Sequence, residues 1–448
     1  MERIRRFMEH PRRALFSLAA PTLIGMLVQT TYNIVDTAFV GRLGPDAIAA
    51  LTFAFPLFIM LFALNSGIAI GMGSLISRSL GAGNKKRAEN AAMHGLVMSI
   101  LLAIVLAMIG IPAMPWLFEL FGASGHVLQT GVTYMRIVLA GIVLMFTNYI
   151  IHYIFSSQGD TRTPMVIQII SLLVNIALDP IFIYVLGFGA PGAAMATVCA
   201  FTVGFVLGYI LLKKKSQLTI EPRYFRHSWP MVKNILSVGI PATLMMMLIS
   251  ISQMVINRLM VTYSVLHVAM YGLVSRLESL MIMPSVAFAS AAMTLVGMFF
   301  GARRYDLLKD VVKFTGMIIV GISIIAGSVF ILLPKTFLQI FTDNPEILSI
   351  GAPYLRIEVL MFPFLGLTML TIRALQGMGF GLPSLIINLV RIVGVTLPLA
   401  FLAVLVFEMS YLAIAVSLVI GSVVSMIMAW IWFGWRLKRC LSGAPECP

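Results

Sequence analysis

Charged residues are scarce in this chain: Asp, Glu, Lys and Arg make up 11% of its 448 residues, whereas 60% are hydrophobic. A soluble protein of this size cannot cover its surface with so few charges, which excludes a soluble globular domain. Cysteine is also rare, and its three residues are too few for a disulfide-rich scaffold and match no zinc-binding spacing. The composition therefore predicts a membrane protein that crosses the bilayer many times.

Motifs of nucleotide hydrolysis and of intramembrane catalysis are missing too. The chain has no GxxxxGK[ST] sequence, so it contains no ATP-driven motor of its own, and it has no HExxH or DDxxD sequence. An intramembrane protease or prenyltransferase would have to rely on two isolated aspartates, Asp36 and Asp179. We therefore predict a protein that is not an enzyme and needs no cofactor, and any transport must be driven by an ion gradient or run downhill.

Long apolar stretches divide the chain into twelve predicted transmembrane helices. Each has roughly 20 residues or more, the length of a helix that crosses the hydrocarbon core. The predicted fold is an all-α polytopic membrane protein with spans near residues 14–40, 47–77, 91–114, 130–157, 163–187, 190–212, 234–262, 268–300, 314–334, 348–375, 383–407 and 410–435.

Positive charge gathers at the termini and in every second gap between these spans. Most of the 31 Lys and Arg lie there, whereas Arg42 and Lys335 are the two in the remaining gaps. Because positively charged loops stay in the cytoplasm, both termini and the loop over 213–233 are predicted to be cytoplasmic in an inner (cytoplasmic) membrane. The net charge of +14 is spread over short loops, which predicts contact with membrane lipids and no nucleic-acid partner.

The two halves of the chain repeat each other in register. Pro21 corresponds to Pro241 at an offset of 220 residues, and Pro180 corresponds to Pro398 at an offset of 218. Each copy has six spans, an even number, so the copies share one orientation and form two pseudo-symmetric lobes. The expected domains are an N-lobe over 1–212, a cytoplasmic linker over 213–233, a C-lobe over 234–437 and a cytoplasmic tail over 438–448.

Polar side chains recur on one face of the first and fifth spans. Gln29, Asn33 and Asp36 are spaced at i, i+4 and i+7, and Asn175 and Asp179 at i and i+4. Ionisable groups inside a bilayer are costly and are therefore functional candidates. Carboxylate and amide oxygens suit either a proton relay or a hard cation such as sodium. We predict an ion-coupling site at Asp36, Asp179 and Asn175, with sodium as a candidate ligand of the same three residues.

The second copy of the repeat lacks both aspartates. Ile256 stands at the position of Asp36, and Leu397 at that of Asp179. This difference places ion coupling in the N-lobe. The intramembrane charges of the C-lobe are Arg276, Glu278 and Arg391. Their roles stay open.

Buried amides also have a purely structural use. Asn and other polar side chains commonly form hydrogen bonds between transmembrane helices and hold a bundle together. For Asn33, Asn148, Asn175 and Asn388, the sequence leaves a packing role and a functional role equally open.

Several segments together resemble one transporter family. They are TTYNIVDTAFVGRLG (Thr30–Gly44), LGAGN (Leu80–Asn84) with its counterpart FGARR (Phe300–Arg304), and SQGDTRTP (Ser157–Pro164). These segments resemble the multidrug and toxic compound extrusion (MATE) family over about residues 10–437. The resemblance implies a V-shaped antiporter, active as a monomer, that exports organic, often cationic or amphiphilic compounds by alternating access in exchange for protons or sodium.

Within that family the chain is most similar to the branch of DinF-type and archaeal transporters. The resemblance implies that Asp36 couples the ion and that Asn175, Asp179 and Thr197 belong to its network. The candidate substrate-binding residues are Gln29, Tyr32, Asn33, Asn148, Met247, Gln253 and Arg276.

One alternative within the same superfamily is a flippase for lipid-linked precursors. Its cavity must hold an anionic headgroup, which calls for several basic side chains inside the spans. Only Arg258, Arg276 and Arg391 are available here, so the sequence favours the antiporter.

Overall fold

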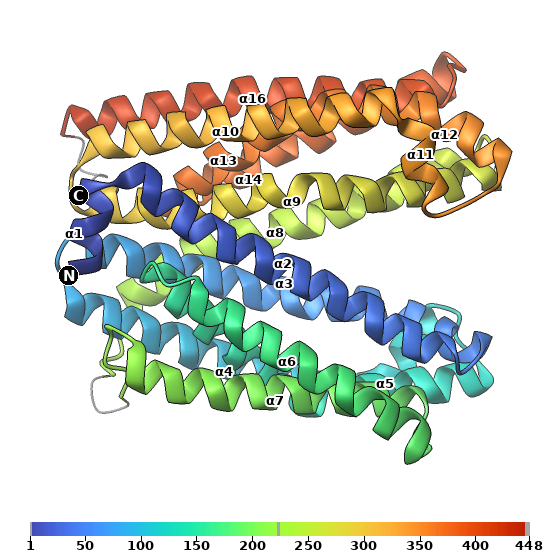
Figure 1. Ribbon diagram of the computed structural model, residues 1–448, viewed down its shortest axis with the longest axis horizontal. Coiled ribbons are helices and arrows are strands. Elements are labelled where there is room, and N and C mark those ends of the chain that lie inside the picture. Colours follow the sequence, from blue (N-terminus) through green and yellow to red (C-terminus); the bar gives the residue numbers. More distant parts are fainter. Residues whose placement is uncertain (1, 222–224, 444–448) are drawn as a thin grey trace. The chain divides into compact units, whose positions relative to one another are not determined.

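The computed structural model describes residues 2–221 and 225–443 (Figure 1). In this part of the chain every regular element is a helix, and no strand is present. Twelve helical segments of the described chain are long and apolar enough to cross a membrane. The predicted all-α polytopic fold is therefore confirmed.

The first half of the chain contains seven α-helices and one π-helical segment. The N-terminal helix α1 is short, and the six spans follow it. Their bounds are α1 (Glu2–Glu9), α2 (Pro11–Gly41), α3 (Pro45–Gly81), α4 (Lys85–Leu120), α5 (Gly125–Ser157), α6 (Arg162–Pro180), the π-helix η1 (Ile181–Val185) and α7 (Ala190–Lys215).

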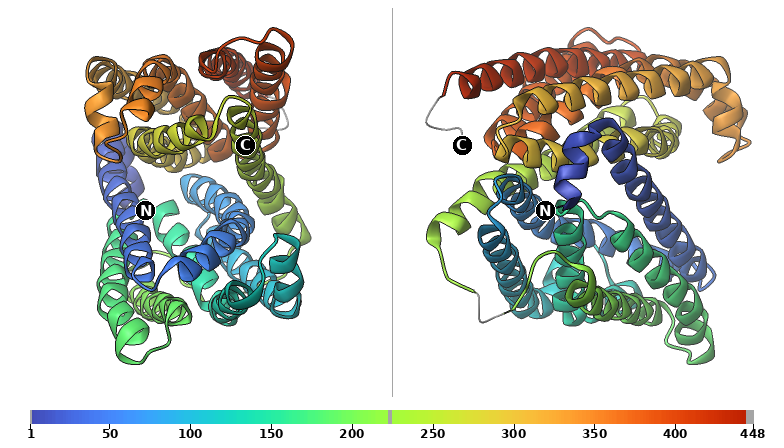
Figure 2. Two further views of the ribbon diagram at one scale, coloured as in Figure 1. Left: turned by 90° about the vertical axis from the view of Figure 1, so that its right-hand side faces the viewer. Right: turned by 60° about the vertical axis from the view of Figure 1, so that its left-hand side comes forward.

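The second half repeats this order with more interruptions. Its tenth and eleventh spans each consist of several consecutive helical segments. The helices of this half are coloured from yellow-green to red in Figure 2. The bounds are α8 (Trp229–Val261), α9 (Val265–Gly301), α10 (Tyr305–Leu332), α11 (Pro334–Gln339), α12 (Pro345–Glu358), η3 (Val359–Met361), α13 (Phe362–Met378), α14 (Leu382–Leu389), η4 (Val390–Thr396), α15 (Leu397–Phe401), η5 (Leu402–Val406) and α16 (Leu412–Leu441).

The chain forms two compact units, each of which has its own core. Unit 1 contains residues 17–239 together with Arg3, and unit 2 contains residues 4–16 and the chain from Ile240 onward together with Glu2. The first turns of α2 therefore belong to unit 2. There Arg12 donates two hydrogen bonds to the Asp310 carboxylate, at 2.9 and 3.3 Å, and its guanidinium lies 4.9 Å from the centre of the Phe314 ring.

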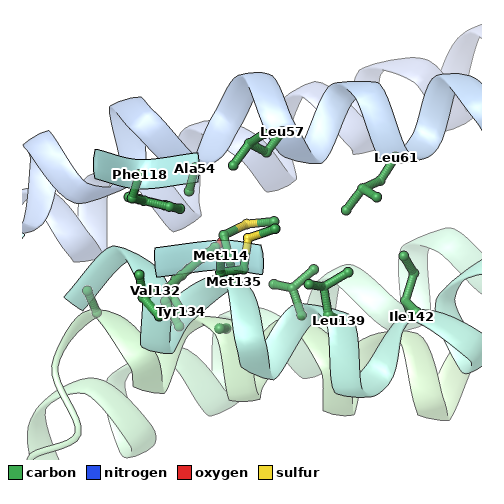
Figure 3. Packing of buried hydrophobic residues seen from close by; sticks show 14 of the residues in the cluster. Ala54, Leu57, Leu61, Met114, Phe118, Val132, Tyr134, Met135, Leu139 and Ile142 are labelled. Carbon is green, nitrogen blue, oxygen red and sulfur yellow. The ribbon is translucent and has the colours of Figure 1, made fainter. Parts of the chain in front are cut away.

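The core of unit 1 lies among α3, α4 and α5 (Figure 3). Leu57 and Leu61 of α3 face Phe118 of α4 and Leu139 of α5. Lipid tails are as apolar as these side chains, so close packing rather than exclusion of water stabilises the interface. Gly131 of α5 permits this packing, because an added Cβ would collide with the ring of Phe118.

Helices α2 and α8 each contribute residues to both compact units. α2 belongs to unit 2 up to Phe16 and to unit 1 from Ser17, and α8 belongs to unit 1 up to Gly239 and to unit 2 from Ile240. Within unit 1, α8 lies directly against α3, because a Cβ added at Gly239 would lie 2.6 Å from the Gly67 carbonyl oxygen. Within unit 2, Ile256 of α8 is buried in the core. These two helices are the first of each repeat.

The repeated loop motif adopts the same backbone conformation in both halves. Gly83 of LGAGN has φ 74° and Arg303 of FGARR has φ 60°, and the two positions correspond at the offset of 220 residues. Glycine adopts this left-handed conformation freely, whereas another residue type is destabilised by about 1–2 kcal/mol. In the first loop the Asn84 side chain also accepts a hydrogen bond from the Arg87 backbone N–H at 3.0 Å and caps α4.

The helix of the fifth span changes type at Pro180. α6 ends at Pro180 and continues as the π-helix η1. Proline lacks a backbone N–H, so the regular hydrogen-bond pattern cannot run through it. In the second copy the π-helix η5 follows Pro398 after one turn.

Candidate functional site

Tyr32 connects α2 to α7 through a buried hydrogen bond. Its hydroxyl group donates to Thr197 Oγ1 at 2.9 Å, and both side chains are buried. The Tyr32 ring also makes an edge contact with Phe201, with ring centres 6.2 Å apart. This hydrogen bond is one of the specific interactions that position α2 against the rest of unit 1.

Asn175 and Asp179 of α6 form a second buried pair. Asn175 Nδ2 donates to Asp179 Oδ1 at 3.1 Å, and neither residue is exposed to any measurable extent. Asn175 Oδ1 and Asp179 Oδ2 are buried and have no hydrogen-bond partner in the protein. Two free acceptor oxygens thus lie within one helical turn.

Asp36 of α2 completes the group. Its Oδ1 atom is buried without a hydrogen-bond partner, and its carboxyl group interacts electrostatically with that of Asp179. The hydroxyl groups of Tyr32 and Tyr134 interact electrostatically with both carboxyl groups. The structure therefore brings the predicted residues Asp36, Asp179 and Tyr32 together and adds Tyr134 of α5.

Tyr134 was missed as a site residue by reasoning from the sequence. It lies on the fourth span, without an acidic neighbour that would single it out. One signal was available, because Tyr134 recurs as Tyr354 at the offset of 220 residues. The repeat therefore marks this position, although it does not assign a role to the hydroxyl group.

The group can hold a small cation through oxygen atoms. Its donors are carboxylate, amide and hydroxyl oxygens, the ligand types that protons and hard cations prefer. Among the described residues, no three His, Cys, Asp or Glu lie close enough to hold a transition metal. Two carboxyl groups, two tyrosine hydroxyls and one amide suit the reversible uptake of a single positive charge.

The candidate substrate-binding residues fall into exposed and partly buried positions. Gln29 and Asn33 of α2 are exposed in unit 1. In unit 2, Gln253 of α8 and Arg276 of α9 are exposed, and Met247 of α8 is half-buried. Four of these side chains are thus accessible to a ligand without rearrangement.

Asn148 occupies a different environment. It is buried on α5, its Oδ1 atom has no hydrogen-bond partner, and its amide group faces Gly204 of α7. Asn388 of α14 is also buried, and its Nδ2 atom donates to the Ser384 carbonyl oxygen of its own helix at 3.0 Å, so this hydrogen bond does not join two helices.

Unit 2 contains a buried charge cluster that the sequence did not predict. Glu358 of α12 is fully buried, and neither of its carboxyl oxygens has a hydrogen-bond partner. It interacts electrostatically with Glu278 of α9, which in turn interacts with Arg391 of η4. These residues are far apart in sequence, so the sequence does not predict that they meet. Arg276, two residues from Glu278, is exposed.

Comparison with known proteins identifies the family of the chain. The MatE family profile matches residues 21–181 and 241–402, one match in each half. A relative named probable multidrug resistance protein YoeA, from Bacillus subtilis strain 168, is 29% identical over 442 residues, which cover 95% of each chain. A relative named FAD transporter, from Shewanella oneidensis, is 27% identical and covers 87% of each chain.

Solved structures agree with this result. A crystal structure of MATE in the bent conformation superimposes with a TM-score of 0.92 at 30% identity, over 97% of each chain. A MOP superfamily transporter from Pyrococcus furiosus superimposes with a TM-score of 0.91 at 29% identity, over 96% of each chain. The members of this family are transporters and not enzymes. The chain therefore belongs to the MatE family of multidrug and toxic compound extrusion (MATE) transporters.

Proposed function

We propose that this protein is a secondary active antiporter that exports organic, often cationic compounds in exchange for protons or sodium. The observation that carries this proposal is the buried oxygen-rich group of unit 1, in which Asp36 and Asp179 interact and two acceptor oxygens of α6 lack a partner. Buried charges without a counter-ion are strongly unfavourable, so binding of a cation stabilises this arrangement. Of the candidate residues, Thr197 acts through its hydrogen bond to Tyr32.

Coupling follows from the charge state of Asp36 on α2. A cation bound at Asp36 neutralises the carboxylate and removes the energetic cost of burying its charge. Release of the cation restores the charge and its cost. A ligand shifts a conformational equilibrium only through its different affinities for the two states, and two such ligands influence each other reciprocally. Ion and substrate can therefore drive each other across the membrane by alternating access.

The candidate substrate-binding side chains of each unit are polar or polarisable. In unit 1, Gln29 and Asn33 offer hydrogen bonds. In unit 2, Gln253 offers hydrogen bonds, Met247 offers a flexible thioether, and Arg276 is positively charged. Side chains of these kinds adapt to ligands of different shapes. The relatives named for multidrug resistance and for FAD transport are consistent with different cargoes on one scaffold. They do not favour a flippase for lipid-linked precursors.

The proposed arrangement keeps the expected domains: an N-lobe over 1–212, a linker over 213–233, a C-lobe over 234–437 and a tail over 438–448. The protein acts as a monomer in the cytoplasmic membrane, with both termini in the cytoplasm, as the distribution of Lys and Arg favours. The similarity to the DinF-type and archaeal branch stays a prediction.

Reconstitution tests this proposal directly. Purified protein in liposomes is loaded with a fluorescent organic cation, and either a proton gradient or a sodium gradient is imposed. We expect one of the two gradients to drive movement of the dye against its own concentration gradient. Equal dye movement with and without each gradient would contradict antiport, and the effective gradient identifies the coupling ion.

A further inference from the structure

Helix α6 carries more polar residues on one face than ion coupling alone requires. Gln168, Ser171, Asn175 and Asp179 follow one another at intervals of three or four residues and therefore share one side of the helix. Asn175 and Asp179 belong to the coupling group. Gln168 and Ser171 extend the same face toward the end of the helix that begins at Arg162.

Several buried polar atoms along this face have no hydrogen-bond partner in the protein. They are Asp179 Oδ2, Asn175 Oδ1 and Ser171 Oγ on α6, and Asn148 Oδ1 and His152 Nε2 on α5. In folded proteins about 90% or more of buried polar groups have a partner, so a run of exceptions in one region needs an explanation. Water bound along the row supplies the missing hydrogen bonds, since a buried water needs 2–4 polar neighbours.

Glycines allow neighbouring helices to pack closely against this row. A Cβ added at Gly204 of α7 would lie 2.6 Å from Ser171 Oγ and 3.2 Å from Asn148 Nδ2. A Cβ added at Gly25 of α2 would collide with Gln168 Oε1. A larger side chain at either glycine would therefore displace the polar groups of the row.

The repeat shows that the scaffold does not need these polar residues. In the register that Pro180 and Pro398 define, all four polar positions of α6 are apolar in the second copy. Gln168, Ser171, Asn175 and Asp179 correspond to Ile386, Leu389, Val393 and Leu397. The polar face is therefore a property added to unit 1 and not a condition of folding.

We infer that this row is a hydrated proton path that connects Asp36 and Asp179 with the end of unit 1 at which α6 begins. This inference rests on the proposed antiport function and assigns a proton to the coupling step. The loop before α6 carries Asp160 and is predicted to be cytoplasmic. Ser171 and Asn148 hold the water between the carboxyl groups and that loop, and His152, one turn beyond Asn148 on α5, is the titratable group on the way.

Protons fit this path better than a dehydrated metal cation. Beyond the two aspartates and Asn175, the row consists of hydroxyl, amide and imidazole groups that form hydrogen bonds with water. A bare hard cation instead takes about six or more oxygen ligands. The charged or titratable groups that face it are Asp36, Asp179, Tyr32, Tyr134 and His152. Among these groups, Asp36 and Asp179 accept the proton at the end of the path that lies away from the loop before α6.

Two variants test the path. Gly204→Ala places a methyl group between Ser171 and Asn148, and Ser171→Ala removes a hydroxyl group without adding volume. Gly141→Ala is the matched control, because its added Cβ would lie 2.5 Å from Val198 Cγ1, between α5 and α7 but among apolar atoms. Each variant is reconstituted in liposomes, and two rates are measured: proton-driven efflux of a fluorescent cation, and exchange of labelled against unlabelled substrate without net proton movement.

We expect Gly204→Ala to lower proton-driven efflux by about tenfold and to leave substrate exchange within about twofold of the wild type. Ser171→Ala should also lower proton-driven efflux more than substrate exchange, but by a smaller factor than Gly204→Ala. Gly141→Ala should change both rates by the same factor. Equal loss of both rates in Gly204→Ala and Ser171→Ala, or unchanged proton-driven efflux in both, would overturn the path.

The outcomes separate this inference from the proposed function. If Asp36→Asn stops gradient-driven efflux while Gly204→Ala and Ser171→Ala do not alter it, the antiport function stands and the path is wrong. If the wild-type protein responds to a sodium gradient alone, antiport also stands and a proton path is excluded. If neither gradient drives efflux in the wild type, the proposed function itself fails.

Discussion

Units 1 and 2 derive from one repeated scaffold, yet they bury charge in different ways. In unit 1, Asp36 and Asp179 lie near each other, and no ion pair of the described chain involves either of them. In unit 2, Glu278 and Glu358 are accompanied by Arg391. One guanidinium can balance the charge of one of the two acids of unit 2, whereas the two acids of unit 1 have no such partner and need an external cation. This difference supports the proposal that unit 1 exchanges ions and that unit 2 holds a partly internal charge balance.

The residues at equivalent positions support the same conclusion. Ile256 replaces Asp36 in the second copy and is buried in the apolar core of unit 2 with Leu259 and Tyr271. The scaffold therefore accepts an apolar side chain at this place and packs it well. An acid at the same position of unit 1 has been kept at an energetic cost, as expected for a group with a function.

The largest effect is expected for Asp36→Asn. The amide preserves size and most hydrogen bonds but cannot take up a proton or carry charge, so gradient-driven efflux should fall by roughly 5- to 150-fold, the range of a coupling free energy of about 1–3 kcal/mol. Efflux from proteoliposomes is the measurement, and unchanged thermal unfolding is the control for folding. Efflux at the wild-type rate would show that Asp36 is structural and that the two units do not differ in coupling.

Substrate binding should depend on pH through unit 1. Protonation of Asp36 and Asp179 removes the negative charge that attracts a cation, so affinity should decrease as the pH falls between about pH 8 and about pH 5. One competing proton weakens binding by at most about tenfold per pH unit. Equilibrium binding of a fluorescent cation, without sodium, is the measurement.

Asp36→Asn serves as the comparison in this titration. This variant should bind the cation weakly at every pH and show a flatter profile. An equally tight affinity of the wild type across the whole range would exclude proton competition and favour sodium.

Glu358→Gln is expected to have a smaller effect. If unit 2 balances charge internally, loss of one acid should leave gradient-driven efflux within about twofold and should retain the pH dependence of binding. Efflux and binding are measured as for Asp36→Asn. A loss as large as that of Asp36→Asn would mean that both units couple ions and would end the distinction between them.

The smallest effect is expected for the matched pair Tyr354→Phe and Tyr134→Phe. The Tyr354 hydroxyl is buried without a hydrogen-bond partner, and its removal relieves an unsatisfied group. We expect an increase in stability of up to about 1 kcal/mol, visible as a higher melting temperature in detergent. Tyr134→Phe should instead reduce coupling, because its hydroxyl group interacts with Asp36 and Asp179. Equal effects of both variants on efflux would argue that the two tyrosines have one common role.

The local part of the site was accessible from the sequence. The spacing of Asn175 and Asp179 on one helix predicts that the two side chains meet, and they do so at 3.1 Å. The link between Tyr32 and Thr197 was implied only by the family resemblance, because these residues are far apart in the chain. Ser171 and His152 are not predicted as site residues from the sequence, since a single serine or histidine in an apolar span is usually a packing residue.

The charge cluster of unit 2 shows more clearly which contacts the sequence does not predict. Glu278 and Arg276 are two residues apart, and the sequence treats them alike. The structure exposes Arg276 and places Glu278 within electrostatic range of Glu358 and Arg391. Their grouping depends on the rotation of three helices about their own axes, a quantity that an apolar run does not specify.

The number of spans, the duplication and the polar faces of the first and fifth spans were determined by the sequence itself. Each follows from local quantities, namely the length of an apolar run, its repetition at a constant offset and the helical period. Which polar atoms remain without a partner, and which acid lies beside which, was decided only by the tertiary structure. The reason is physical: the energy of a buried charge depends on groups from other helices within a few ångströms, and helix packing alone brings those groups together.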